Sequence, residues 1–253
     1  MSRQPRVPKD RSAGSEFAEK SSNGSKIVLP VDGDAFVFSD DLRAKLPGDT
    51  ERTWLTLAPL LPTSAYLVGG TGLTVHLLHR ISRDLDFFLE QPEDLAALAV
   101  VLENAGNVVF TRRDDRTLNL QFNETKVQIL DAQSQRQIRP SITVAGVRVA
   151  SVEDIMATKL NVITKRGELR DYFDLMAIEQ QRQIRVEEGI AYALARYSPS
   201  VPSEYVQFIL PSLGYLGDVE DDDSLPVERS VIESYWIRRR REIEGHIAGL
   251  GEL

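Results

Sequence analysis

The order of apolar and polar residues predicts a mixed sheet in the first part of the chain. Short apolar runs bounded by glycine or polar residues predict buried strands at 65–68, 85–89, 108–112, 118–122, 127–130 and 144–150. Apolar positions three or four residues apart predict helices at 49–61, 73–79 and 92–105. Pro62 ends the first helix, and a hairpin turn near Asn123 and Glu124 should connect two of the strands.

The rest of the chain is predicted to be helical. Ser151 and Asp154 resemble a capping box, so we expect a helix to begin at Ser151 and to end at Gly167. Further helices are predicted at 168–181, 186–197, 203–210 and 227–250. Strands that alternate with helices and then give way to a helical half indicate an α/β (α+β) protein, with a mixed sheet and flanking helices.

Three parts of the chain follow from this pattern. Residues 1–26 are rich in Ser, Lys, Arg and Gly without periodicity, and we expect a disordered tail. Residues 27–150 should form the domain that holds the sheet, and residues 151–253 a helical C-terminal domain. The basic start of the tail could contact an acidic partner, but a solubilising tail is the preferred interpretation.

Composition narrows the class of protein. The 30 Lys and Arg residues and 38 Asp and Glu residues give a net charge of −8, which counts against binding nucleic acid through bulk charge but leaves room for a local RNA-binding patch. The absence of cysteine excludes disulfides and thiolate metal sites. No apolar run reaches the ~18 residues of a membrane helix, and no secretory signal begins the chain. We therefore expect a cytoplasmic protein without a membrane partner.

Asp84 and Asp86 are candidate metal ligands. They flank Leu85 at the start of a predicted strand, and residues two apart on a strand point to the same face. Two carboxylates on one face can share a hard cation such as Mg²⁺, and phosphoryl transfer often uses two such ions about 3.5–4 Å apart. Leu85, Phe87 and Leu89 should face the core. Taken alone, the Asp-x-Asp pattern is weak and more often belongs to an ordinary surface strand.

A glycine-rich turn just upstream changes that balance. Gly69, Gly70 and Thr71 lie between a predicted strand and a predicted helix. Glycine lets the backbone approach a phosphate closely, and a helix start offers free N–H groups to an anion. Thr71 could add a hydroxyl or cap the helix. The turn matches neither a Walker loop nor a Rossmann fingerprint, so an ordinary strand-to-helix turn is the alternative.

A second group of charged residues lies in the helical half, namely Lys159, Arg166, Arg170, Asp171 and Asp174. The cations could bind triphosphate oxygens and stabilise charge in a transition state. The two carboxylates, three residues apart on a helix, could hold those cations in place. Without the upstream pair, this group would be a solvated helix face.

These segments resemble a known family. Tyr-Leu-Val-Gly-Gly-Thr at 66–71 and His-Arg-Ile-Ser-Arg-Asp-Leu-Asp-Phe-Phe at 79–88 are similar to the signature of the AbiEii/AbiGii nucleotidyltransferase toxins. The segment at 150–160 with Arg-Gly at 166–167 and Arg-Asp-Tyr-Phe-Asp-Leu at 170–175 resembles that family's second block. The order and spacing match over about residues 60–180. Two blocks in register are more specific than either alone.

The resemblance implies a function as well as a polymerase-β-like nucleotidyltransferase fold. The family consists of toxins whose antitoxin is a separate DNA-binding protein, and some relatives add nucleotides to the tRNA 3′ end. Carried over by position, Gly70 and Thr71 would cradle a nucleoside triphosphate, and we expect Gly69, Arg166 and Arg170 to bind it with them. Asp84 and Asp86 would bind Mg²⁺, Lys159 would contact phosphate, and Asp171 and Asp174 would complete the catalytic group.

One position departs from the nucleotidyltransferase pattern. A third acid is common on a later strand, and here that strand carries Gln128, while Asp131 falls on the opposite strand face unless a bulge intervenes. Two readings therefore remain open besides transfer to RNA such as tRNA. The chain could be a catalytically weakened binding or regulatory protein, or a transferase acting on a protein or small molecule.

Other features rank lower. His76 and His79 lack an apparent third metal ligand, so we expect a packed or exposed pair. The four arginines at 238–241 point all round a helix, and a solvated helix end is expected, with an RNA contact as the alternative. Trp54 and Trp236 are expected in the core.

Overall fold

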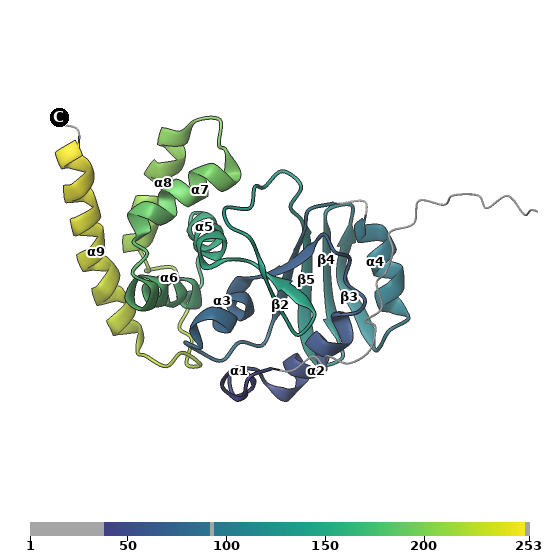
Figure 1. Ribbon diagram of the computed structural model, residues 1–253. Coiled ribbons are helices and arrows are strands. Elements are labelled where there is room, and N and C mark those ends of the chain that lie inside the picture. Colours follow the sequence, from purple (N-terminus) through teal and green to yellow (C-terminus); the bar gives the residue numbers. More distant parts are fainter. Residues whose placement is uncertain (1–37, 92–93, 251–253) are drawn as a thin grey trace, which may run out of the picture.

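A computed structural model describes residues 38–91 and 94–250 (Figure 1). The predicted tail at 1–26 lies outside the described residues. Within them, a seven-stranded mixed sheet has the order β3-β4-β5-β2-β1-β7-β6. The strands are β1 Ala65–Val68, β2 Leu85–Leu89, β3 Val108–Asp114, β4 Thr117–Phe122, β5 Thr125–Asp131, β6 Ile142–Val144 and β7 Val147–Val149. The central strand β2 pairs antiparallel with β1 and parallel with β5, so the predicted mixed sheet is confirmed.

Helices surround this sheet. Those of the described residues are α1 Asp40–Arg43, α2 Gly48–Leu57, α3 Gly69–Leu77, α4 Asp94–Glu103, α5 Val152–Ile163, α6 Leu169–Arg182, α7 Val186–Tyr197, α8 Pro202–Gly214 and α9 Arg229–Leu250. Helices α5 to α9 gather at one side of the molecule, α4 lies at the other, and α3 lies between the sheet and the helical half (Figure 1). The described residues include no helix long and apolar enough to cross a membrane.

The sheet separates two hydrophobic cores, because side chains alternate along each strand. Leu85, Phe87 and Leu89 point into the core shared with α1, α2 and α4, which also contains Trp54. Phe88 points into the other core, which joins the sheet and α3 to α5–α9 and contains Trp236. Both tryptophans and the three predicted β2 positions are fully buried, as the sequence indicates.

Two predicted helices have different ends. Helix α3 begins at Gly69 rather than at residue 73, because the chain passes from β1 into the helix without an intervening turn. Helix α5 has Ser151 as its N-cap, as predicted, but it ends at Ile163 and not at Gly167. The glycine pair is therefore the first turn of a helix, and its backbone N–H groups have no side-chain cap.

The predicted strand at 144–150 is a hairpin instead. Strands β6 and β7 pair antiparallel around Ala145 and Gly146, both of which have positive φ, at 44° and 78°. A two-residue turn of this kind requires left-handed conformations, for which Asn-Gly is the usual signal. Alanine at the first position hid the turn in the sequence. The predicted turn at Asn123 and Glu124 is confirmed, with Asn123 at φ 50°.

A buried ion pair ties the helical half to the sheet side of the molecule. Arg196 of α7 donates to Asp154 of α5 at 2.5 Å and to the Tyr66 hydroxyl of β1 at 2.8 Å. Both charged side chains are at most 1% exposed. Burying a charge is costly unless a partner compensates it, so this pair depends on both members being present.

We expect Arg196→Ala to lower the free energy of unfolding by about 3–5 kcal/mol, because it leaves Asp154 buried without its cation. Urea denaturation measures this loss. Arg139→Ala is the matched control, since Arg139 is 59% exposed and lies 3.7 Å from Glu153, and its loss should stay below ~1 kcal/mol. Equal losses in the two variants would contradict the assignment.

Candidate active site

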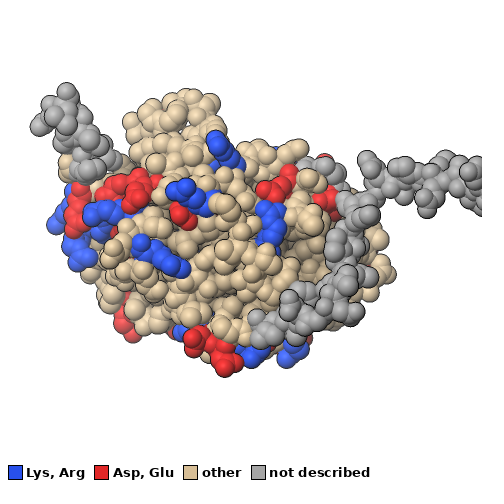
Figure 2. Space-filling view, in the orientation of Figure 1, with Lys and Arg blue, Asp and Glu red and all other residues tan. Residues whose placement is uncertain are grey.

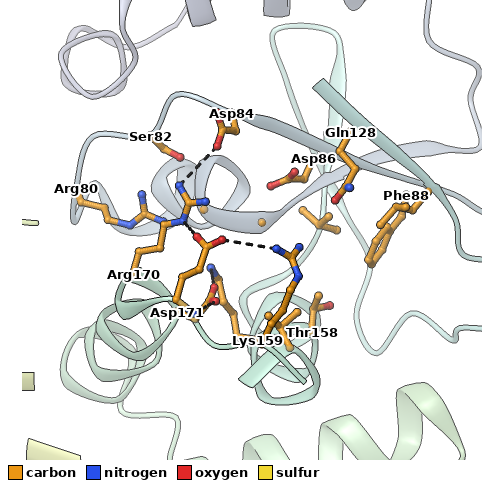
Figure 3. Close-up of a pocket in the computed structure, with 17 residues that line it drawn as sticks. Arg80, Ser82, Asp84, Asp86, Phe88, Gln128, Thr158, Lys159, Arg170 and Asp171 are labelled. Carbon is orange, nitrogen blue, oxygen red and sulfur yellow. Dashed lines mark hydrogen bonds and ion pairs between the residues drawn. The ribbon is translucent and has the colours of Figure 1, made fainter. Parts of the chain in front are cut away.

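A cavity of about 210 Å³ opens between the glycine-rich start of α3, the first half of β2, and helices α5 and α6. Its lining residues are Val68, Gly69, Gly70, Arg80, Ser82, Asp84, Asp86, Phe88, Gln128, Leu130, Thr158, Lys159, Val162, Arg166, Glu168, Arg170 and Asp171. The two sequence blocks, which lie far apart in the chain, thus face each other across one cavity (Figure 3).

Asp84 and Asp86 both reach this cavity, as the strand alternation predicts. Asp84 directly precedes β2, and Asp86 is its second residue. Burial, together with the nearby charge of Asp84, raises the pKa of Asp86 to about 6. A nearby cation would stabilise this carboxylate. Its positive charge would offset both the cost of burying the negative charge and the repulsion from Asp84.

The pair fits a hard divalent cation by its chemistry and by the space around it. Both side chains offer oxygen donors, which Mg²⁺ prefers. A Cβ at Gly69 would overlap with the carboxylate of Asp86, and Gly69 has a φ of 66°. Glycine at this position therefore leaves the room that the carboxylate occupies, and it alone adopts this backbone angle without strain. Asp84 and Asp86 have no third acid or histidine placed to share a metal ion with them, since the described residues hold no group of three or more such side chains.

Gly70 has a different neighbour. A Cβ on it would overlap with the guanidinium of Arg80 and come within 3.1 Å of the Ser82 hydroxyl oxygen. Both glycines line the cavity and are the first two residues of α3. A helix start with free amides is favourable for an anion, which agrees with the predicted place for phosphate.

Thr71 is placed differently from the prediction. Its side chain is fully buried, outside the lining of the cavity. Its hydroxyl donates to the Asp84 carbonyl oxygen at 2.5 Å and lies 2.8 Å from the Ser82 hydroxyl. The side chain therefore fixes the segment that leads into Asp84, because both of its contacts are inside the protein, and it neither caps α3 nor reaches the cavity.

The second block is a buried charge cluster. The Lys159 ammonium lies 2.7 Å from Asp171 and 2.6 Å from Asp174. Burial acts to lower the pKa of Lys159, but the charges of these two carboxylates outweigh it and raise that pKa. Lys159 thus lines the cavity and at the same time neutralises two buried carboxylates.

Asp174 does not reach the cavity. Its side chain is fully buried and contacts His79 and Arg80 as well as Lys159. Burial alone would raise the pKa of Asp174, but the Lys159 and Arg80 charges hold it well below its usual range. Asp174 was predicted as a catalytic residue, but its side chain contacts the cavity residues Arg80 and Lys159 and not the cavity itself.

Arg80 was not singled out from the sequence, whereas the expectation that His79 is packed rather than a metal ligand agrees with its burial. The guanidinium of Arg80 contacts Asp174 through Nε at 2.6 Å and Nη2 at 2.9 Å. His79 is 1% exposed and lies 2.7 Å from Asp174 through Nε2, and burial lowers its pKa, so the neutral ring donates to the carboxylate. His76 instead lies 2.7 Å from the Ala150 carbonyl oxygen. The available signal was the place of Arg80 inside the segment at 79–88 that resembles the family signature.

Arg166 and Arg170 line the mouth of the cavity and are more exposed than Lys159. Arg170 lies 2.5 Å from Glu168 and 3.6 Å from Asp84, and Arg166 lies 3.6 Å from Glu168. Asp171 and Asp174 were expected to hold all three cations, but they hold Lys159 and not these arginines. Glu168, a residue not singled out in the sequence, pairs with both arginines instead.

Gln128 lies beside Asp86. The parallel pairing of β2 and β5 aligns Asp86 with Gln128 and Leu89 with Asp131 without a register shift. The Gln128 amide nitrogen donates to Asn119 at 2.9 Å. Asp131 faces away from the cavity and pairs with Arg116 at 3.1 Å. The predicted register is therefore confirmed, and Gln128 occupies the expected position of a third acid.

The side chains of the arginines at 238–241 point in different directions around α9. Arg239 is 7% exposed and pairs with Glu179, Glu187 and Glu242, whereas Arg238 and Arg240 pair with acids on their own helix. Acids thus neutralise each of these three charges. The predicted spread of this run around the helix is confirmed, but the expected solvated helix end is wrong for Arg239, which is buried among these acids.

The mixed sheet presents two carboxylates beside the uncapped start of a helix, opposite lysine and arginine side chains. Together with the family profile, this arrangement identifies the class of protein as a nucleotidyltransferase. The chain belongs to the family of nucleotidyl transferase AbiEii toxins of type IV toxin–antitoxin systems, whose profile matches residues 56–230. An uncharacterized protein of Aquifex aeolicus (strain VF5) is 25% identical over 174 residues, which are 68% of this chain and 80% of that protein.

Two solved structures show similarity at low identity. The Helicobacter pylori protein JHP933 is 17% identical with a TM-score of 0.49, covering 85% of this chain and 97% of that one. MenT4, a nucleotidyltransferase toxin of Mycobacterium tuberculosis H37Rv, is 18% identical with a TM-score of 0.40, covering 83% of this chain and 93% of that one.

We expect Asp86→Asn to stabilise the metal-free protein at pH 8. Because folding raises the pKa of Asp86 from 3.8 to about 6, the ionised carboxylate opposes folding above pH 6, and this cost disappears below pH 3.8, where both states are protonated. The two pKa values set an upper bound of ~3 kcal/mol. Solvent in the cavity screens the charge, so a gain of ~1 kcal/mol is expected.

Thermal unfolding with a chelator at pH 8 and at pH 4.5 measures this gain, which should shrink at the lower pH. Asp115→Asn in the exposed β3–β4 turn is the matched control and should leave the stability unchanged. The absence of a gain at pH 8, or the same gain in both variants, would show that the ionised Asp86 carboxylate does not lower the stability of the folded protein.

Proposed function

We propose that this nucleotidyltransferase binds Mg²⁺ through Asp84 and Asp86 and transfers a nucleotidyl group from a nucleoside triphosphate to an RNA acceptor such as tRNA. The charge of the cavity carries this proposal. Its lining includes four cations, Arg80, Lys159, Arg166 and Arg170, and four anions, Asp84, Asp86, Glu168 and Asp171. A triphosphate would therefore enter a neutral cavity, and divalent cations would supply the missing positive charge.

The metal's chemical contribution would be to neutralise phosphate oxygens and align the reacting groups. Asp84 and Asp86 would hold it on the β2 side of the cavity. The amides of Gly69 and Gly70 would bind phosphate oxygens, and Lys159 with Arg166 and Arg170 would balance the charge of the leaving group. In the transfer, the acceptor oxygen bonds to the α-phosphorus, the bond to pyrophosphate breaks, and the hydroxyl proton passes to solvent.

The acceptor is proposed from the family rather than from the surface. On the face seen in Figure 2, the described Lys and Arg side chains are interspersed with Asp and Glu. Such a surface supports contact with one end of an RNA more than binding along a duplex. Membership in a toxin–antitoxin family supports a cognate antitoxin as the protein partner.

A second function rests on Gln128. A glutamine can coordinate a cation through its carbonyl oxygen, but it cannot accept a proton, so a chain with reduced catalysis could serve as a nucleotide-binding regulator. A protein or small molecule as acceptor is the remaining alternative. These functions differ in which molecule, if any, receives label from a labelled nucleoside triphosphate: RNA, a protein or a small molecule.

We expect wild-type protein to transfer label from α-³²P-labelled NTPs to total RNA in the presence of Mg²⁺. Asp86→Asn should lower this transfer at least ~100-fold, because an amide cannot replace an anionic metal ligand. Gel analysis of the RNA, of the protein and of small molecules identifies the acceptor. Label on RNA supports the proposal, label on protein or a small molecule replaces the acceptor, and binding without transfer favours the regulator.

Gln128 and Asp131 form a matched pair on one strand. Gln128→Asp should preserve or raise transfer and lower the Mg²⁺ concentration needed for half-maximal rate, because it adds a carboxylate beside Asp86. Asp131→Asn should change neither quantity, since its side chain faces Arg116. Rates measured over a Mg²⁺ titration test both. A loss of activity in folded Asp131→Asn would make Asp131 the third carboxylate.

A further inference from the structure

The geometry points to Arg80 as a phosphate-binding residue, held in place for the triphosphate by the buried carboxylate of Asp174. The inference rests on the proposed function for the identity of the ligand. It adds a cation that the sequence pattern did not single out, and it gives Asp174 the part of a positioning residue. Figure 3 shows the Arg80 side chain at the edge of the cavity, on the side of Ser82 and Arg170.

The hydrogen bonds of Arg80 leave donors for a ligand. Its Nε and Nη2 donate to Asp174, and its Nη1 donates to the Ile81 carbonyl oxygen at 3.1 Å. A guanidinium has more N–H groups than these contacts use, so one N–H on each Nη nitrogen is left. Because Arg80 lines the cavity, those groups lie where an oxyanion can accept them.

Gly70 brings the start of α3 against this guanidinium. A Cβ at position 70 would overlap with Nη2 of Arg80, so only glycine allows the two to lie this close. The first amides of α3 have no side-chain cap. One phosphate group could therefore accept hydrogen bonds from the helix start and from Arg80 together, which neither offers alone.

Arg80 is the most buried of the three arginines that line the cavity. Its side chain is 7% exposed and held at two points by a fully buried carboxylate, whereas the side chain of Arg166 is 76% exposed. Lys159 also pairs with Asp174, so this carboxylate has two cationic neighbours. A cation fixed before the ligand arrives loses little freedom on binding, and this makes its contacts more effective.

The test measures binding of inorganic tripolyphosphate with Mg²⁺ to the full chain by calorimetry. Arg80→Met alone would remove a partner of buried Asp174, so the informative variant is Arg80→Met with Asp174→Asn, which removes both charges. Its tripolyphosphate affinity should be about tenfold to a hundredfold below that of Asp174→Asn alone, because charge-assisted hydrogen bonds to phosphate are lost. Thermal unfolding should show similar stability for these two variants.

Arg112→Met, a change at an exposed residue of β3, is the control for losing one positive charge and should leave the affinity unchanged. Equal tripolyphosphate affinity in the double variant and in Asp174→Asn would overturn the inference and leave Arg80 a structural counter-ion. If the double variant does not fold, Arg80→Lys replaces it, since lysine keeps a charge beside Asp174 but lacks the fork, and its affinity should still fall about tenfold. Wild-type protein that binds tripolyphosphate through Arg80 but labels no acceptor would refute the proposed function and not this inference.

Discussion

The buried carboxylate of Asp174 determines how the two halves of the active site meet. A charge in the protein interior must be compensated or the fold loses several kcal/mol. Asp174 on α6 takes its partners from two other places, His79 and Arg80 before β2 and Lys159 on α5. The contacts that compensate Asp174 therefore hold the segment before β2, which leads to Asp84 and Asp86, against the helical half. The cavity lies between β2 and the helices α5 and α6.

A second constraint is the space beside the carboxylates. Gly69 leaves room for Asp86, and Gly70 leaves room for Arg80. Thr71 then fixes the segment before β2 through the Asp84 carbonyl oxygen. The Gly-Gly-Thr sequence thus has a structural explanation that does not depend on a ligand. The same two glycines line the cavity at the uncapped start of α3, so the fold and the proposed phosphate binding require the same residues.

The sequence predicted the parts of this site that follow from local periodicity. Strand alternation placed Asp84 and Asp86 on one face and separated Gln128 from Asp131, and both hold in the structure. The partners of Asp174 could not be predicted in this way, because a contact between α6 and the segment before β2 depends on tertiary packing. The same limit applies to Thr71, whose side chain turns inward, and to Ala145, whose left-handed backbone is set by the β6–β7 pairing.

The pairing of charges at the cavity links metal binding to nucleotide binding in the proposed reaction. Arg170 lies between Asp84 and Glu168, so this cation is partly occupied by an acid that the metal would need. A divalent cation at Asp84 and Asp86 would replace Arg170 as the counter-charge, and the released guanidinium could turn to a phosphate. A triphosphate would in turn bring further oxygen ligands to the metal. Each ligand therefore favours the other, which is a reciprocal coupling of their binding free energies, and it originates in a cavity whose acids and cations balance before either arrives.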